Sequence, residues 1–107
     1  MKSVAVLLAA SLPTLLFAAG EGEYSLALEN HRFTPDRLEI PAGKKVKVTV
    51  ENKDATPEEF ESNVLRIEKV IPGKSKGIVF IGPLKPGEYP FIGEYNEKTA
   101  KGVVVAK

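Results

Sequence analysis

The sequence contains no cysteine and a single histidine, His31. Without cysteine no disulfide can form, so a domain this small has to rely on its hydrophobic core, with a metal or a partner as a further source of stability. The 15 basic residues nearly balance the 14 acidic ones, which leaves a formal net charge of +1. This balance offers no support for nucleic acid or an anionic membrane as a partner.

One long apolar run lies near the N-terminus, at residues 4–19. It follows a positively charged start and closes on Ala18-Ala19-Gly20, the order that is typical of a secretory signal peptide. The alternative is a retained membrane anchor. It is disfavoured because Pro13 interrupts the run and because the run is short for a membrane span. We predict a signal peptide at residues 1–19, cleaved between residues 18 and 20, and one domain at residues 20–107 with no direct membrane insertion after cleavage.

The remaining residues alternate between apolar and polar over short stretches separated by Gly and Pro turns. The clearest stretch is Lys45 to Glu51, where Val46, Val48 and Val50 share one face. Tyr89, shortly after Pro86-Gly87, fits a tyrosine corner. Together the stretches predict an all-β fold, a Greek-key antiparallel β-sandwich of about seven strands. The expected strands are residues 23–29, 37–40, 45–51, 64–71, 76–81, 88–92 and 102–106.

Residues 57–62 have a different character. Thr56 could cap a helical turn, with Pro57 in its first position and Glu59 three residues after the cap. We therefore expect one short helix or helical turn near residues 57–62, or else a loop.

Four segments carry a family resemblance: Phe33-Thr34-Pro35, Ile40-Pro41-Ala42-Gly43, residues 48–54 and residues 86–91. They resemble the cupredoxin-like domain family over nearly all of residues 20–107. Residues 56–62, 68–70 and 82–84 look more specifically like small periplasmic proteins related to the EfeO-type cupredoxin domain. The resemblance implies a periplasmic accessory in bacterial iron uptake through a permease, with periplasmic and membrane iron-transport proteins as partners.

The copper ligands of that family are not present in this sequence. In type 1 copper members the resemblance places the first histidine at Glu58, the cysteine at Gly93, the second histidine at Asn96 and the methionine near Ala100. A blue-copper centre needs two imidazoles and a thiolate in a trigonal plane. With no type 1 copper site available, electron transfer at such a centre is excluded.

The resemblance also predicts that an acidic segment near Glu58 lies beside the loop carrying Glu94. Carboxylates are hard donors suited to Fe2+ or Fe3+, manganese, calcium or Cu2+, and a converging set needs a cation to neutralise it. We predict a metal site from Glu58, Glu59 and Glu94, with Glu61, Glu68, Glu97 and His31 as further candidates. Alternatively, the glutamates form a solvated face, Glu68 joins a surface ion pair and His31 is a surface or supporting residue.

Three functions stay open at this point. In the first, the protein binds iron, or Cu2+ as the alternative ion, as an accessory of an uptake permease. In the second, it is a metal-free protein–protein interaction module. In the third, it is a ferroxidase, although the sequence indicates no catalytic residue.

Overall fold

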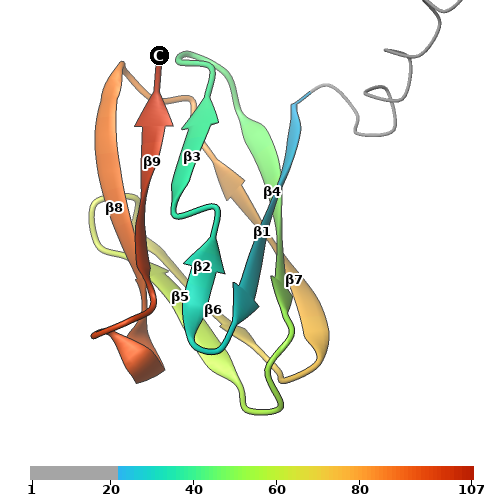
Figure 1. Cartoon of the computed structure of the whole chain (residues 1–107). Helices are drawn as coiled ribbons and strands as arrows, with labels where there is room; N and C mark the ends of the chain where they lie inside the picture. The colour runs from blue at the N-terminus through green and yellow to red at the C-terminus, as the bar shows by residue number, and fades with distance from the viewer. Residues whose placement is uncertain (1–21) are drawn as a thin grey trace, which may run out of the picture.

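The computed structural model describes residues 22–107 and shows two packed β-sheets with almost no helix (Figure 1). The predicted signal peptide and its cleavage site lie outside the described residues. A short 3-10 helix, η3 (Glu94–Asn96), connects the last two strands. The strands are β1 (Glu23–Glu29), β2 (Arg32–Thr34), β3 (Arg37–Ile40), β4 (Val46–Asn52), β5 (Glu58–Ser62), β6 (Ile67–Ile71), β7 (Ser75–Ile81), β8 (Gly87–Gly93) and β9 (Lys101–Ala106).

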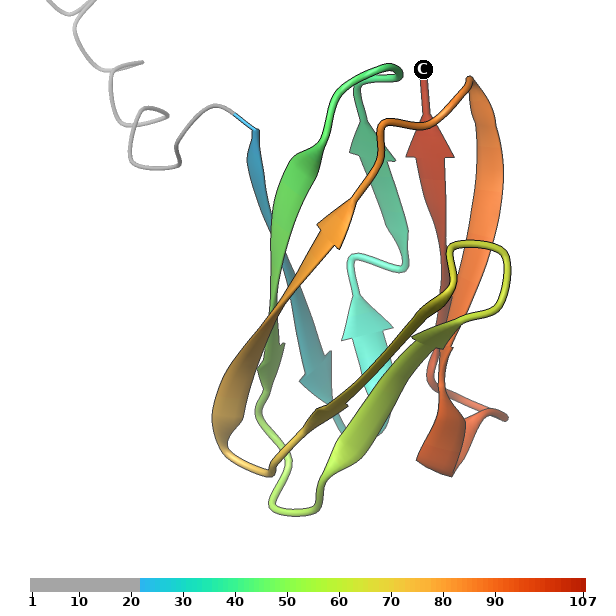
Figure 2. The same ribbon diagram turned by 180° about the vertical axis from the view of Figure 1, so that it is seen from behind.

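One sheet has the strand order β2-β1-β4-β7 and the other the order β3-β9-β8-β5-β6. The predicted all-β sandwich is therefore confirmed. The β1–β4 and β3–β9 pairs run parallel, while the other pairs are antiparallel. The β5–β6 hairpin lies at the front in Figure 2, and η3 lies at the end of the sandwich away from the C-terminus (Figure 1).

The core lies between the two sheets and has an aromatic centre. Strand β4 alternates as expected, with its three valines buried and Lys47, Thr49 and Glu51 half-buried; Asn52 at its end is buried. Phe60 from β5 stacks on Phe91 from β8 with ring centroids 5.0 Å apart, and Phe33 from β2 meets Phe91 edge-on at 5.1 Å. Such aromatic pairs add to the stabilisation that burial supplies. This cluster anchors β5 and β8, the two strands that carry the candidate site.

The expected short helix near residues 57–62 is wrong, because this segment is strand β5. It pairs with β6 over Glu58–Ser62 and with β8 through Phe60 and Glu61. Sheet pairing on both sides, together with burial of Phe60, overrides the local capping pattern of Thr56 and Pro57.

Strands β2 and β5 also account for the difference between the seven predicted strands and the nine observed. The stretch predicted as a strand at residues 64–71 forms one only from Ile67. Its first part turns, with Arg66 at a positive φ of 57°. Residues 63–66 therefore close the β5–β6 hairpin.

The tyrosine corner is confirmed, since the Tyr89 hydroxyl donates a 2.7 Å hydrogen bond to the Lys85 carbonyl. Across residues 22–107, no helix has the length and apolar character needed to cross a membrane.

Candidate metal site

The candidate site residues on strand β5 lie on two faces of the sheet, because the side chains of the strand alternate between them. Side chains of neighbouring residues in a strand point to opposite faces. Glu58, Phe60 and Ser62 are buried between the sheets, whereas Glu59 and Glu61 are half-buried on the outer face. The glutamates that the sequence groups together therefore belong to two different environments.

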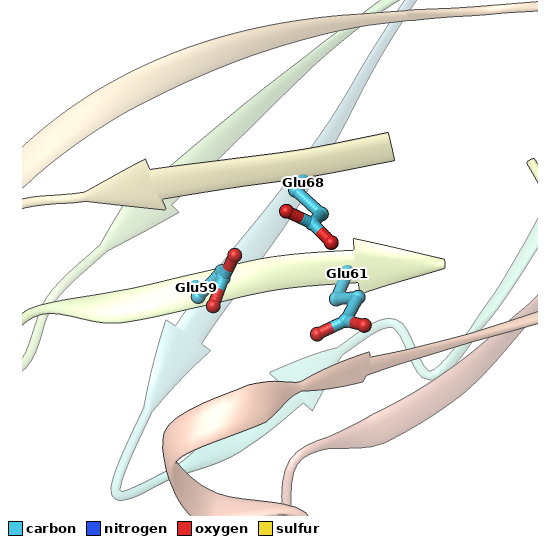
Figure 3. A group of neighbouring side chains, drawn as sticks. All are labelled: Glu59, Glu61 and Glu68. Atoms are coloured by element: carbon cyan, nitrogen blue, oxygen red, sulfur yellow. The ribbon is translucent and has the colours of Figure 1, made fainter. Parts of the chain in front are cut away.

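An outer carboxylate cluster forms where β5 and β6 pair, and Figure 3 shows its three side chains. Glu59 and Glu61 project from β5, and Glu68 projects from β6, directly opposite Glu61 in the antiparallel register. One carboxylate oxygen from each of the three lies within 4.8 Å of the others. This is close enough for one cation to contact all three side chains.

Glu94 extends this cluster from the start of η3. The pKa of Glu61 is raised to about 7, in the first place by a hydrogen bond that its carboxyl shares with Glu94. Partial burial and repulsion from the other cluster carboxylates raise it further. Burial also raises the pKa of Glu59, and the charges of Glu68 and Glu94 add to that shift. Glu61 and Glu59 therefore hold their protons to a higher pH than an isolated glutamate does.

Basic residues do not neutralise the cluster. Within residues 22–107, the ion pairs closer than 4.0 Å involve only Asp54, Glu39 and Glu88 among the acidic residues. None of the four cluster glutamates is among them. Like charges that face each other across a sheet destabilise it, and a bound cation would remove that cost.

Glu58 has a different role, because it is only 2% exposed and its carboxylate is fully hydrogen-bonded. The backbone N–H of Tyr95 donates to Oε1 at 2.8 Å, and the Asn96 side-chain amide donates to Oε2 at 2.7 Å. The backbone N–H of Glu59 also donates to Oε1, at 3.0 Å. These bonds join β5 to η3, so the two acidic segments lie side by side as predicted.

The four positions at which the family resemblance predicts copper ligands lie close together at this point. A Cβ added to Gly93 would lie 2.7 Å from Cδ of Glu58 and 2.8 Å from Cβ of Ala100. The Asn96 carbonyl accepts a 2.8 Å hydrogen bond from the Ala100 N–H. Glu58, Gly93, Asn96 and Ala100 provide one carboxylate and one amide, and the chain has no cysteine. This set does not fit a type 1 copper ion, which needs a thiolate and two imidazoles.

The remaining candidates, His31 and Glu97, lie near the same end of the sandwich. They line a groove together with Glu94–Asn96, Lys98 and Thr99. The His31 Nδ1 atom lies 3.5 Å from Asp54, whose carboxylate also accepts the N–H groups of Asn30 and His31. These contacts tie the β1–β2 turn to the residues after β4. Neither His31 nor Glu97 belongs to the outer carboxylate cluster.

Sequence reasoning placed Glu58 in the metal site but did not identify its burial. If residues 58–62 are read as a strand, inward Phe60 puts Glu58 inside and puts Glu59 and Glu61 outside. The signal was therefore present, but the helix-capping pattern at Thr56-Pro57 obscured it.

The family model described as "Cupredoxin-like domain" matches residues 2–106, so the chain belongs to the cupredoxin-like domain family. A protein of Rickettsia prowazekii (strain Madrid E), named uncharacterized protein RP394, is 34% identical over 83 residues. That match covers 78% of this chain and 66% of the relative, so it spans just under two thirds of the relative's length.

Solved structures with the same fold include copper proteins. The Cu(I) form of an amicyanin carrying a single substitution superimposes with a TM-score of 0.67 at 17% identity, covering 83% of this chain and 86% of amicyanin. A purple cupredoxin from Nitrosopumilus maritimus gives 0.61 at 17% identity, covering 78% and 99%. The metal-binding domain of the Streptococcus pneumoniae D39 Cu(I)-exporting ATPase CopA gives 0.64 at 16% identity, covering 79% and 84%. At these identities the similarity shows that the fold is shared, and nothing more about function.

Proposed function

We propose that this protein is a periplasmic accessory of bacterial iron uptake that binds a hard cation on its surface rather than copper in its interior. The observation that carries the proposal is the outer carboxylate cluster of Glu59, Glu61, Glu68 and Glu94, with no basic partner within 4.0 Å among residues 22–107. Oxygen donors of this kind suit ferrous, ferric or manganous ions. On this proposal, the chain is an EfeO-type cupredoxin relative that lacks type 1 copper ligands.

The setting of the cluster suits transport better than permanent storage. It lies on an open sheet face, with Glu59 and Glu61 half-buried and Glu68 exposed, so water can complete the coordination of the ion. An ion held in this way can be passed to a second protein without unfolding the donor. The partners that we propose are periplasmic and membrane iron-transport proteins, which receive the ion from the exported chain.

The test compares thermal melting with and without Mn2+ or anaerobic Fe2+, and with Cu2+ as the alternative ion. A ligand bound only by the folded state at about a hundred times its Kd adds about 2.7 kcal/mol. For a domain of this size we expect a rise in Tm on the order of 10 °C. The Glu59→Gln/Glu61→Gln/Glu68→Gln variant should lose most of that rise.

The matched control is Glu23→Gln/Glu29→Gln/Glu51→Gln, which removes the same number of charges from the other sheet. It should keep the wild-type response to the ion. An equal rise in both variants would rule out the outer cluster as the binding site. Oxidation of Fe2+ by the wild-type protein above the buffer blank would favour the ferroxidase alternative.

A metal-free interaction module is the second candidate, and one feature of strand β7 favours it. Ile78 and Phe80 point outward and are 43% and 56% exposed, next to Lys76 on the same face. Exposed apolar patches on a protein surface often mark contacts with other proteins. This function predicts no change in Tm with any of the ions above, so the same experiment decides between the two candidates.

A further inference from the structure

Glu58 lies beside Gly93 and Asn96, two further positions at which the family resemblance predicts copper ligands. Its carboxylate fills the space beside Gly93 and accepts a hydrogen bond from the Asn96 amide. A larger residue than glycine at position 93 would meet the Glu58 carboxylate at 2.7–2.8 Å. The interior therefore has room for this carboxylate because residue 93 has no side chain.

Burial of a carboxylate is costly unless hydrogen bonds compensate for the lost water. Glu58 has such compensation from three donors, two of which belong to η3, 37 and 38 residues away along the chain. Among residues 22–107, it has no basic partner within 4.0 Å. The hydrogen bonds therefore act mainly as a cross-link between β5 and η3.

The cross-link has a consequence for the outer cluster. Glu94 is the first residue of η3 and directly precedes Tyr95, whose N–H binds Glu58. Glu59 and Glu61 flank Phe60 on the strand that carries Glu58. The buried carboxylate thus adds a second link between β5 and the chain at Glu94, beyond the pairing of Phe60 with Gly93.

We propose that the Glu58 carboxylate is the side-chain group that ties β5 to the 94–96 turn, and that it thereby positions Glu94 beside Glu61. Glu58 is a positioning residue in this scheme and does not contact the cation. The second half of the inference rests on the proposed function, whereas the first half concerns the fold alone.

Two substitutions separate the possible roles. Glu58→Leu keeps a similar volume but removes every acceptor, so Tyr95 N–H and the Asn96 amide lose their partner. Glu58→Gln keeps an oxygen for the two backbone N–H groups, and the Asn96 amide can turn its oxygen towards the new NH2 group. The leucine variant should therefore release the turn, and the glutamine variant should hold it.

The first measurement is amide hydrogen exchange at Tyr95, made without any cation. We expect Glu58→Leu to lose protection there by at least about tenfold, and Glu58→Gln to stay near wild type. The second is Mn2+ affinity by calorimetry, where Glu58→Leu should bind roughly tenfold more weakly, as is usual when a supporting residue is lost. Glu58→Gln should again stay near wild type.

Other outcomes overturn the inference. If Glu58 were itself a ligand, both variants would lose affinity together. If it only filled space, neither would change. Should Glu58→Leu fail to fold, Asn96→Ala removes the side-chain half of the cross-link and should weaken Mn2+ binding in the same direction. If wild type binds no Mn2+, the proposed function fails, while the exchange measurement still tests the cross-link.

Discussion

Glu61 faces Glu68 directly across the β5–β6 pair and shares a hydrogen bond with Glu94. Three carboxyl groups from three elements therefore meet at one side chain. Such an arrangement is stable only when a proton or a cation reduces the repulsion. The pKa of about 7 for Glu61 shows that, without a cation, a proton is retained there up to near-neutral pH.

The raised pKa gives the metal-free protein a defined pH dependence. In the unfolded chain, Glu61 loses its proton near pH 4.5, whereas in the folded protein it does so near pH 7. Between these pH values the folded state therefore binds more protons than the unfolded state. Its contribution to stability is thus complete below pH 4.5 and is lost as the pH rises through 7. We expect the Tm of the metal-free protein to fall between about pH 5 and 8, and Glu61→Gln to flatten that fall.

Glu51→Gln, on the other sheet, serves as the control and should keep the wild-type slope. Other groups that titrate in this range are present in all three proteins, so the difference between slopes isolates Glu61. An unchanged slope in Glu61→Gln would show that the carboxyl is not coupled to its neighbours. Saturating Mn2+ should also flatten the wild-type slope, since the cation takes the place of the proton.

At the scale of elements, β5 shows both what the sequence could reveal and what it could not. The predicted strands that correspond to β1, β3, β4, β7, β8 and β9 have clear apolar alternation or short apolar runs between turns, which local reading can detect. In β5 only Phe60 is apolar among the three inward positions. Its strand character depends on pairing with β6 and β8, which a local pattern cannot show.

The site could be predicted only in part, because it too depends on pairing between distant segments of the chain. Convergence of the residue-58 segment on the residue-94 segment followed from the family resemblance and is confirmed by the contacts of Glu58. The burial of Glu58 depends on donors 37 and 38 residues away, and Glu68 enters the cluster through sheet register. Such long-range pairings have no signature in sequence spacing.

Phe60 is the residue through which β5 is attached to the core. It is fully buried and stacks on Phe91. The glutamates near it on β5 carry both the buried carboxylate and the carboxylates of the outer cluster. We expect Phe60→Ala to lower the free energy of unfolding by about 3–5 kcal/mol, as large-to-small core substitutions do. Urea denaturation measures this loss.

Phe80→Ala is the comparison for that experiment, because this phenylalanine is 56% exposed. It should cost far less, within about 1 kcal/mol. Similar losses in both variants would contradict the assignment of Phe60 to the core. They would also weaken the account of β5 as a strand held by its inward aromatic side chain.

At the scale of the whole molecule, the two sheets expose different groups, although exposed Val70 on β6 lies opposite Glu59. The outer face at β5 and β6 carries the carboxylate cluster, whereas β7 of the other sheet exposes Ile78 and Phe80 beside Lys76. Lys45 also lies over the Phe80 ring, 5.0 Å from its centroid. A nearly neutral chain can therefore present one face to a cation and a different face to a protein.

The fold also brings together the four positions at which the family resemblance predicts copper ligands, although none of them is a histidine, cysteine or methionine. Hydrogen bonds and close packing among Glu58, Gly93, Asn96 and Ala100 bring these positions to one point without a metal. It follows that contacts within the protein, including the hydrogen bonds of the Glu58 side chain, hold these positions together without an ion. The chain should therefore accept a copper site when the side chains are replaced, because a bound ion can then supply the link that Glu58 supplies here.

We expect the variant Glu58→His/Gly93→Cys/Asn96→His/Ala100→Met to bind Cu2+ and to develop the intense visible absorption of a thiolate–copper bond. Two imidazoles, one thiolate and a weak axial thioether are the donors of a type 1 centre. Replacing Glu58 removes the carboxylate that a Cβ at residue 93 would meet at 2.7 Å, and the Cβ of residue 100, which would lie at 2.8 Å, has to move slightly. The variant that keeps Gly93 but carries the other three changes is the control and should stay pale. If the full variant, folded by circular dichroism, gave only the weak colour of nitrogen and oxygen ligands, then the four positions would not have the geometry of a copper site.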